Sequence, residues 1–542
     1  MQSGGDALST RRNFLKQTSL GLAAAAVGPS AWAHAQKAAS SKPNILLILV
    51  DDMGWSDIGC YGGEVATPNI DALATGGYRF TQFHNTAKCF PSRACLLTGL
   101  YAQQCGMGER SGKITNATTL GEVMRSAGYR TLMTGKHHGT DNPFDRGFDR
   151  YYGLRDGACN HFNPGDQREG EGAPARKEAS AEMRKQIEST GGKAPGYPRT
   201  WCIDDQVISP FTPEKGFYST DNFTKYALNY LDDYESEDKP FFMYLSYTAP
   251  HDPLMAWPED IARYRGRYLK GYEALRKERY ERQRDIGLID DTFPISDPTY
   301  DAWDSLTEEQ RDEEDQKMAV YCAMIDRVDQ NIGKVVDKLR AQGELDNTLI
   351  LFASDNGCSS EVVPPAFLNP TSNEGPIGSM TRWASLSTSW ANVSNTPFRY
   401  YKNFSHKGGT CTPLVAHWPN GIEGKNMISH EVGHFIDFMP TFAELGGATY
   451  PSEFGGSPIP PMQGQSLLPI LRGESYTRQN PIYWNWRDGK AVRQGDYRLV
   501  TDAGGPWELY DMRVDRTETN DIAGQHPQIV SELSTLYETW AF

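Results

Sequence analysis

The distribution of apolar and polar residues along the chain predicts buried strands separated by helices. Four apolar runs are nearly continuous, which is typical of strands covered on both faces, and they lie at 45–50, 130–134, 240–247 and 348–353. Patterns typical of helices lie between them, at 67–74, 119–127, 220–234 and in a long charged segment that ends near Gly343. This order predicts an α/β fold with a large, mostly parallel sheet covered by helices on both faces.

Polar side chains follow all four predicted strands. They are Asp51 and Asp52 after the first, Lys136, His137 and His138 after the second, His251 after the third, and Asp355 and Asn356 after the fourth. Active sites of open α/β sheets gather at the carboxyl ends of the strands, so we expect these residues to share one site. The carboxylate and amide oxygens suit calcium or magnesium better than zinc. Taken alone, however, either acidic pair could simply cap a turn or a helix.

Segments without clear periodicity separate some of these elements. Residues 154–215 and 252–305 are rich in charge, Gly and Pro, and we expect them to be long loops or insertions over the site. A similar segment, 359–397, carries Trp383 and Trp390. These tryptophans either line a substrate cleft or are buried to anchor the loop.

The end of the chain has a different pattern. The Pro/Gly-rich stretch 455–461 indicates a boundary, and it precedes strand-like runs at 482–486 and 497–501 and a final helix at 526–540. We therefore expect a catalytic domain over 36–450 and a smaller C-terminal α+β subdomain over 451–542.

Residues 1–35 have the layout of a cleavable export signal. Arg11 and Arg12 precede an Ala/Gly/Leu-rich stretch and the small residues around Ala35, where we expect cleavage. The arginine pair resembles a bacterial twin-arginine signal, which implies the twin-arginine export machinery as a partner and a periplasmic or secreted protein. The apolar stretch is short and Gly/Ala-rich, and no later run is long enough to span a bilayer, so we expect no stable membrane insertion.

Composition narrows the function. The net charge of −15 over 542 residues argues against nucleic acid as a partner, whereas a local basic pocket could still bind a small anion. The nine cysteines form no zinc-like CxxC pair and no dense disulfide pattern, and the sequence leaves their pairing or burial open.

Residues 89–99, Cys-Phe-Pro-Ser-Arg-Ala-Cys-Leu-Leu-Thr-Gly, concentrate candidate chemistry in one short run. Pro91 suits a first helical turn, so Cys89 is expected at a helix N-terminus, where free N–H groups favour an anion. Arg93, one turn further on, adds a fixed positive charge. The alternative is a buried cysteine before an ordinary helix.

This run resembles the signature of the type I sulfatases of the alkaline phosphatase superfamily, Cys-x-Pro-Ser-Arg followed by Leu-Thr-Gly. The resemblance implies that a separate maturation enzyme oxidises Cys89 to formylglycine and that one Ca²⁺ is bound by Asp51, Asp52, residue 89, Asp355 and Asn356. Further matches are Gly-Lys-x-His at 135–138 and the histidine after Ala-Pro at 251, and Lys402 matches a sulfate-binding lysine. The implied catalytic set is Cys89, Arg93, Lys136, His138, His251 and Lys402.

The implied reaction is hydrolysis of a sulfate monoester, an aryl sulfate or a sulfated carbohydrate. Cations neutralise the sulfate oxygens so that one hydroxyl of the aldehyde hydrate can attack sulfur, with Asp355 accepting its proton. His251 or Lys402 protonates the departing alcohol or phenol. His138 then deprotonates the second hydroxyl, which expels sulfate from the covalent sulfo-enzyme and regenerates the aldehyde.

The chain also departs from the family pattern. His137 and Gly139-Thr140 replace a tryptophan and a Leu-Gly ending, and Lys407 replaces a glutamate. We expect Lys407 to lower the proton affinity of Lys402 or to widen tolerance for anionic substrates.

The stretch 390–398 resembles the arylsulfatase branch, so aryl sulfates are the first choice of substrate and sulfated sugars the second. The alternatives are a phosphonate monoester or phosphodiester hydrolase that uses the same modified cysteine, and a non-catalytic binder of sulfated glycans.

Overall fold

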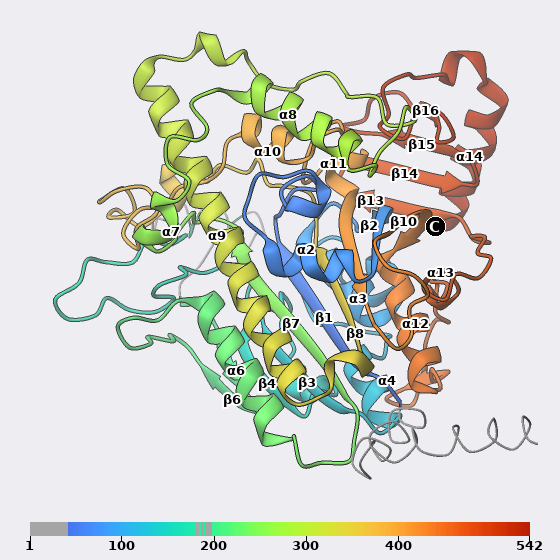
Figure 1. The fold of residues 1–542 in the computed structure, drawn as a ribbon, viewed down its shortest axis with the longest axis horizontal. Coiled ribbons are helices and arrows are strands. Elements are labelled where there is room, and N and C mark those ends of the chain that lie inside the picture. The colour runs from blue at the N-terminus through green and yellow to red at the C-terminus, as the bar shows by residue number, and fades with distance from the viewer. Residues whose placement is uncertain (1–41, 180–181, 183, 186–188, 190–197, 542) are drawn as a thin grey trace, which may run out of the picture. The chain divides into compact units, whose positions relative to one another are not determined.

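The computed structural model describes residues 42–179, 182, 184, 185, 189 and 198–541 (Figure 1). The predicted export signal, residues 1–35, lies outside them. The main sheet consists of β1 (Asn44–Asp51), β2 (Tyr78–His84), β3 (Arg130–Gly135), β4 (Arg150–Leu154), β5 (Trp201–Ile203), β6 (Gln206–Ile208), β7 (Phe241–Pro250), β8 (Thr348–Ser354), β9 (Cys411–His417) and β10 (Met427–His434). Their order in the sheet is β10-β2-β9-β8-β1-β7-β3-β4-β5-β6.

The four strands that the sequence predicted are neighbours at the centre of this sheet. β8, β1, β7 and β3 all run parallel, so their carboxyl ends meet at one edge. Antiparallel strands occur towards both sides, since β9 opposes β8 and β2, and β5 opposes β4 and β6. The prediction of a mostly parallel sheet is confirmed.

Helices cover both faces of the main sheet. The α-helices of the described residues are α2 (Pro68–Thr75), α3 (Cys89–Thr98), α4 (Leu120–Ser126), α6 (Ser219–Asp233), α7 (Pro258–Ala262), α8 (Tyr272–Asp285), α9 (Glu308–Ala341), α10 (Thr388–Ser394), α11 (Lys407–Thr410), α12 (Phe438–Gly446), α13 (Leu468–Leu471) and α14 (Pro527–Ala541), of which α14 packs on the small C-terminal sheet. In Figure 1, α9 and α6 cross in front of the central strands. On the opposite face, α3, α4 and α12 pack together in a hydrophobic cluster that includes Leu96, Met124 and Phe442.

Strand β1 shows why its apolar run is continuous. Leu46, Ile48 and Val50 belong to the cluster under α9, and Ile45, Leu47 and Leu49 belong to the cluster under α3 and α4. Because successive side chains of a strand point to opposite faces, a strand between two helical layers needs an apolar residue at every position.

The C-terminal region is a small antiparallel sheet with one long helix. After a short hairpin, β11 (Glu453–Phe454) and β12 (Ser457–Pro458), the sheet is formed in the order β13 (Ile482–Trp486), β14 (Gly489–Gln494), β15 (Tyr497–Thr501) and β16 (Glu508–Asp511). Helix α14 packs on it through Leu533 and Tyr537. The predicted α+β subdomain is confirmed, whereas its boundary near residue 450 stays a prediction.

The prediction that residues 252–305 form loops is wrong in part, because they contain α7 and α8. Helix α8 buries Arg276, Arg279 and Gln283 beside Tyr272 and Leu275. Arg279 donates to Asp57 at 2.6 Å and to Glu64 at 2.8 Å. A helix whose buried stripe mixes polar and charged side chains with apolar ones lacks the apolar periodicity that predicts helices.

The loop tryptophans are buried rather than exposed to a cleft. Trp390, in α10, is fully buried and donates its indole N–H to the Glu314 carbonyl at 3.0 Å. Trp383 is 7% exposed and packs in a small cluster with Met255 and Leu368. The anchoring interpretation therefore holds.

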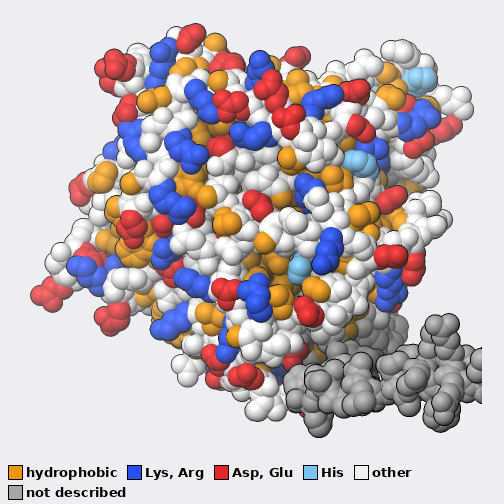
Figure 2. Space-filling model, viewed as in Figure 1, with side chains coloured by type: hydrophobic (Ala, Val, Ile, Leu, Met, Phe, Trp, Pro, Cys, Tyr) orange, Lys and Arg blue, Asp and Glu red, His pale blue; other side chains and the backbone are white. Residues whose placement is uncertain are grey.

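All nine cysteines are free thiols, and eight of them are buried. Among the described helices, none combines the length and the apolar character needed to cross a bilayer. Acidic and basic side chains are mixed over the face shown in Figure 2, so the net negative charge is not gathered in one patch there.

Candidate active site

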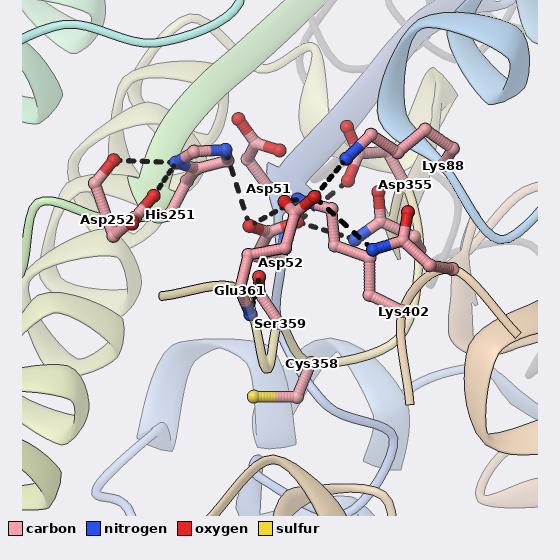
Figure 3. Close-up of polar contacts among 12 residues, drawn as sticks. Asp51, Asp52, Lys88, His251, Asp252, Asp355, Cys358, Ser359, Glu361 and Lys402 are labelled. Carbon is pink, nitrogen blue, oxygen red and sulfur yellow. Dashed lines mark hydrogen bonds and ion pairs between the residues drawn. The ribbon is translucent and has the colours of Figure 1, made fainter. Parts of the chain in front are cut away.

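The ends of the four central strands bring the predicted residues together. Oxygen atoms of Asp51 and Asp355 lie within 4.8 Å of each other and of the Cys89 sulfur, and Asp51, Asp52 and His251 form a second group of the same size. Figure 3 shows the carboxylates, His251 and Lys402 pointing towards one another. The expected convergence at the carboxyl edge of the sheet is therefore present.

Cys89 is the first residue of helix α3. Lys88 precedes it with extended backbone, and Gly99 ends the helix in the left-handed conformation at a φ of 69°. The Cys89 side chain is 2% exposed and lines a cavity of about 720 Å³. Burial raises the pKa of its thiol, although Lys136 and Lys402 counteract this. The encoded residue at this position is thus a neutral thiol facing the cavity.

Arg93 lies behind Cys89 and fixes the strand ends. Its Nε donates to Asp355 at 2.8 Å, and its Nη1 donates to the Ser246 hydroxyl at 2.5 Å and to the Lys136 carbonyl at 3.0 Å. Its Nη2 is buried and has no hydrogen-bond partner among the described residues. Arg93 therefore joins β3, β7 and β8 and retains one donor for an anion.

The two predicted lysines lie against the carboxylates. Lys136 contacts Asp51, and the Lys402 amine lies 2.7 Å from Asp52 and 3.0 Å from Glu361. Burial lowers the pKa of Lys402, but Asp52 and Glu361 more than offset this and hold it well above its ordinary value. Lys407 is not among the main causes of this shift, and the expectation that it lowers the proton affinity of Lys402 or widens tolerance for anionic substrates stays a prediction.

The buried Lys407 amine lies over the Phe398 ring, and its Nζ is 5.3 Å from the ring centre. The other departure from the family pattern, His137, lies 3.1 Å from Asp141 in an ordinary pair. Neither side chain lines the cavity around Cys89.

The two predicted histidines have opposite electrostatic environments. Burial and repulsion from Lys136 and Arg93 hold the pKa of His138 well below its ordinary value. Burial also lowers the pKa of His251, but Asp52 at 3.4 Å and Asp51 outweigh it, so this pKa is raised. The environment of His138 therefore favours the neutral imidazole, which can accept a proton, and that of His251 favours the protonated form, which can donate one.

The acidic cluster fits a hard divalent cation. Asp51 Oδ1 and Asn356 Oδ1 are buried without a hydrogen-bond partner in the described structure. The Asn356 amide donates to Asp52 at 2.6 Å, which directs its oxygen away from that carboxylate. Burial and repulsion from Asp51 raise the pKa of Asp355 to about 6. A bound cation would offset this repulsion between the two carboxylates. Asp51, Asp52, Asp355 and Asn356 could therefore hold calcium through oxygen.

Sequence reasoning missed several residues of the site. Glu361 lies 2.7 Å from Lys88 and 3.0 Å from Lys402, and Asp252 lies 2.8 Å from His251 Nδ1. Asp252 could have been found, because it follows His251 directly. Glu361 could not, because it comes from a segment without periodicity. The cavity wall also includes Phe90, Lys177, Arg199, Phe367 and Arg487.

Comparisons with known proteins agree with this geometry. The Sulfatase family model matches residues 43–448, and a model of the N-sulphoglucosamine sulphohydrolase C-terminal region matches residues 398–539. An uncharacterized sulfatase of Schizosaccharomyces pombe is 31% identical, covering 92% of this chain and 93% of its own. An arylsulfatase of Klebsiella aerogenes is 32% identical, covering 78% of this chain and 91% of its own. The fold is similar to the crystal structure of Ps i-CgsB in complex with k-i-k-neocarrahexaose, with a TM-score of 0.66. The two sequences are 25% identical, and the match covers 93% of each chain.

We expect Asp51→Asn and Asn356→Ala each to weaken Ca²⁺ binding at least about tenfold, because each removes or alters an unpartnered buried oxygen. Calorimetric titration of chelator-treated protein measures this directly. Asp141→Asn is the control, since its carboxylate is paired with His137 and Arg146 outside the cluster. Equal affinity in all four proteins would place the cation elsewhere.

Proposed function

The chain belongs to the sulfatase family and is a sulfuric ester hydrolase, and from this premise we propose that residue 89 acts as its nucleophile after oxidation to formylglycine. The observation that carries the proposal is the position of Cys89 at a helix N-terminus, within 4.8 Å of Asp51 and Asp355, on the wall of a large cavity. An aldehyde hydrate there has a second hydroxyl, which a serine or a thiol lacks.

In the first step, one hydroxyl of the hydrate attacks the sulfur of the ester. The oxygen–sulfur bond to the enzyme forms while the bond to the alcohol or phenol breaks. Arg93, Lys136 and Lys402 neutralise the sulfate oxygens, and Asp355 accepts the proton of the attacking hydroxyl. Bound calcium would add positive charge at the same oxygens.

The departing oxygen needs a proton, and the environment of His251 supports its role as the acid. Its pKa is raised by Asp52 and Asp51 despite burial, which favours the protonated form. Lys402 holds its own proton more tightly, between Asp52 and Glu361. We therefore assign protonation to His251 and charge neutralisation to Lys402.

In the second step, the remaining hydroxyl of the sulfo-enzyme loses its proton to His138. Its oxygen then forms the aldehyde double bond as the bond to the sulfated oxygen breaks and sulfate leaves. His138 suits this step because burial and the nearby Lys136 and Arg93 keep it neutral.

The cavity supports aryl and carbohydrate sulfates as substrates. Phe90 and Phe367 offer apolar contact for an aromatic ring or a sugar face, and Lys177, Arg199 and Arg487 offer positive charge for further acidic groups. The arylsulfatase relative and the oligosaccharide complex of Ps i-CgsB support the two classes respectively.

The central test is the chemistry of residue 89. We expect mass spectrometry of the peptide containing Cys89 to show a loss of about 18 Da, the exchange of thiol for aldehyde. We expect Cys89→Ala to abolish turnover of nitrophenyl sulfate, while Cys95→Ala, which truncates a buried thiol of the same helix, retains it. Full turnover by protein with an unmodified thiol would refute the mechanism. Faster turnover of the matched nitrophenyl phosphonate or phosphodiester would favour the phosphorus-ester alternative.

The role of His251 is tested by changing the leaving group. We expect His251→Ala to slow hydrolysis of a sugar sulfate by roughly 10²–10⁴-fold and of nitrophenyl sulfate far less, since nitrophenolate leaves without a proton. In the parent enzyme, kcat/KM for the sugar sulfate should fall as pH rises through the raised pKa of His251, and this limb should vanish in the variant. His137→Ala is the control. Equal losses on both substrates would indicate a structural role.

We also propose twin-arginine export to the periplasm, after the maturation enzyme has oxidised Cys89. The support is the order of basic, apolar and small residues over 1–35. Replacing Arg11 and Arg12 by lysine should retain the enzyme in the cytoplasm, as measured by fractionation and activity, whereas Lys16→Arg should not. Export of the double variant at the parent level would contradict this route.

A further inference from the structure

A second cavity, whose wall carries four arginines and the two carboxylates of Glu431 and Asp496, lies away from Cys89. It has a volume of about 280 Å³ and shares no lining residue with the cavity around Cys89. Strands β2 and β10 of the main sheet form one wall, and β14 with the segments around Arg478 and Arg516 forms the other. Figure 1 shows β2, β10 and β14 side by side, and Arg493 donates to Gln82 across this junction at 2.7 Å.

Two guanidinium groups on this cavity have buried donors without a hydrogen-bond partner among the described residues. Arg478 is 10% exposed in its side chain and donates Nη1 to Asp437 at 2.6 Å, but its Nε and Nη2 are buried without a partner among the described residues. Arg516 donates Nε to the Met512 carbonyl at 3.2 Å, and its Nη1 is likewise buried without a partner. A buried donor without a partner is energetically costly, and more so when its group is charged.

The charges here are also poorly balanced. Among the described residues, neither Arg493 nor Arg516 forms an ion pair within 4.0 Å. Burial and repulsion from Arg516 and Arg478 lower the pKa of Arg493 to about 10. Further back, burial and repulsion from Arg493 and Arg498 lower the pKa of Lys407 to about 7. Like charges gathered in a buried place create a field that favours an anion.

We propose that Arg478, Arg493 and Arg516 form a second oxyanion site, which binds a sulfate group. Forked guanidinium donors match the oxygens of a tetrahedral anion, and the three arginines come from separate segments that close around one small cavity. The established reaction releases inorganic sulfate, so the anion is present at every turnover. A sulfate ester on a substrate chain presents the same oxygens, and it is the second source of the same chemistry.

The site is tested by calorimetric titration of the mature, calcium-loaded enzyme with sodium sulfate against sodium chloride at equal ionic strength. We expect two sulfates per chain, one beside residue 89 and one between the arginines. Arg516→Gln should weaken the second at least tenfold and leave hydrolysis of nitrophenyl sulfate unchanged, and that activity also verifies folding. Arg493→Gln is a second variant with the same expected result.

Arg513→Gln is the matched control, because Arg513 borders the same cavity but is exposed and paired with Asp511 at 2.6 Å. Two sulfates in this variant support the proposal. The proposal would be overturned if the parent enzyme bound one sulfate only and a small substrate displaced it fully. It would also be overturned if Arg516→Gln and Arg493→Gln both bound two sulfates as tightly as the parent, or if chloride bound as well as sulfate. A higher KM for a sulfated oligosaccharide alone in Arg516→Gln would identify the substrate chain as the source, and an effect on sodium sulfate alone would identify the free product.

Discussion

The balance of buried charge at the ends of β1, β3, β7 and β8 is the constraint on which the site depends. Asp51, Asp52 and Asp355 are at most 1% exposed, and so are Arg93, Lys136 and Lys402. Isolated charges at such depth would be very costly, so each carboxylate has a cation beside it. Because the carboxylates are already matched by Arg93, Lys136 and Lys402, a divalent cation would leave the pocket positive. That excess charge suits a sulfate monoester, which brings negative charge to the same place.

The topology of the sheet explains why the sequence revealed the core of the site. A parallel sheet gathers the carboxyl ends of its strands at one edge, so residues that follow four apolar runs were expected to meet. The Cys89 run could be interpreted in the same way, because Pro91 and Gly99 indicate where a helix starts and stops. In both cases the decisive information is local, within one turn or one strand of the residue concerned.

Other features depend on contacts that no local pattern reveals. The stripe of α8 is polar because Arg279 meets Asp57 and Glu64, more than 200 residues earlier in the chain. Glu361 enters the site from a segment without periodicity. Lys407 was expected to act on Lys402 because it is five residues away, but the two amines point to different surroundings, Phe398 in one case and Asp52 with Glu361 in the other. Sequence distance in a loop is therefore a poor guide to the surroundings of a side chain.

The C-terminal sheet has a direct part in the geometry of the active site. On one side, its β13 fixes the approach to Cys89, since Trp484 donates to the Asn85 carbonyl at 2.7 Å. On the other side it fixes the segment that carries Lys402, where Trp486 donates to Asn403 at 3.1 Å.

Three further contacts attach that segment to the C-terminal subdomain. Arg498 donates to the Ser405 carbonyl at 2.5 Å, Glu508 lies 2.9 Å from His406, and Glu518 accepts from the Lys407 backbone at 2.8 Å. Lys402 itself donates its backbone N–H to Cys358 at 3.0 Å, next to the end of β8. The segment that carries Lys402 is thus held by contacts to both sheets, and these contacts position the Lys402 amine beside Asp52. The C-terminal subdomain therefore supports the geometry of the site, even though the proposed nucleophile and metal ligands come from the main sheet and the helix that begins at residue 89.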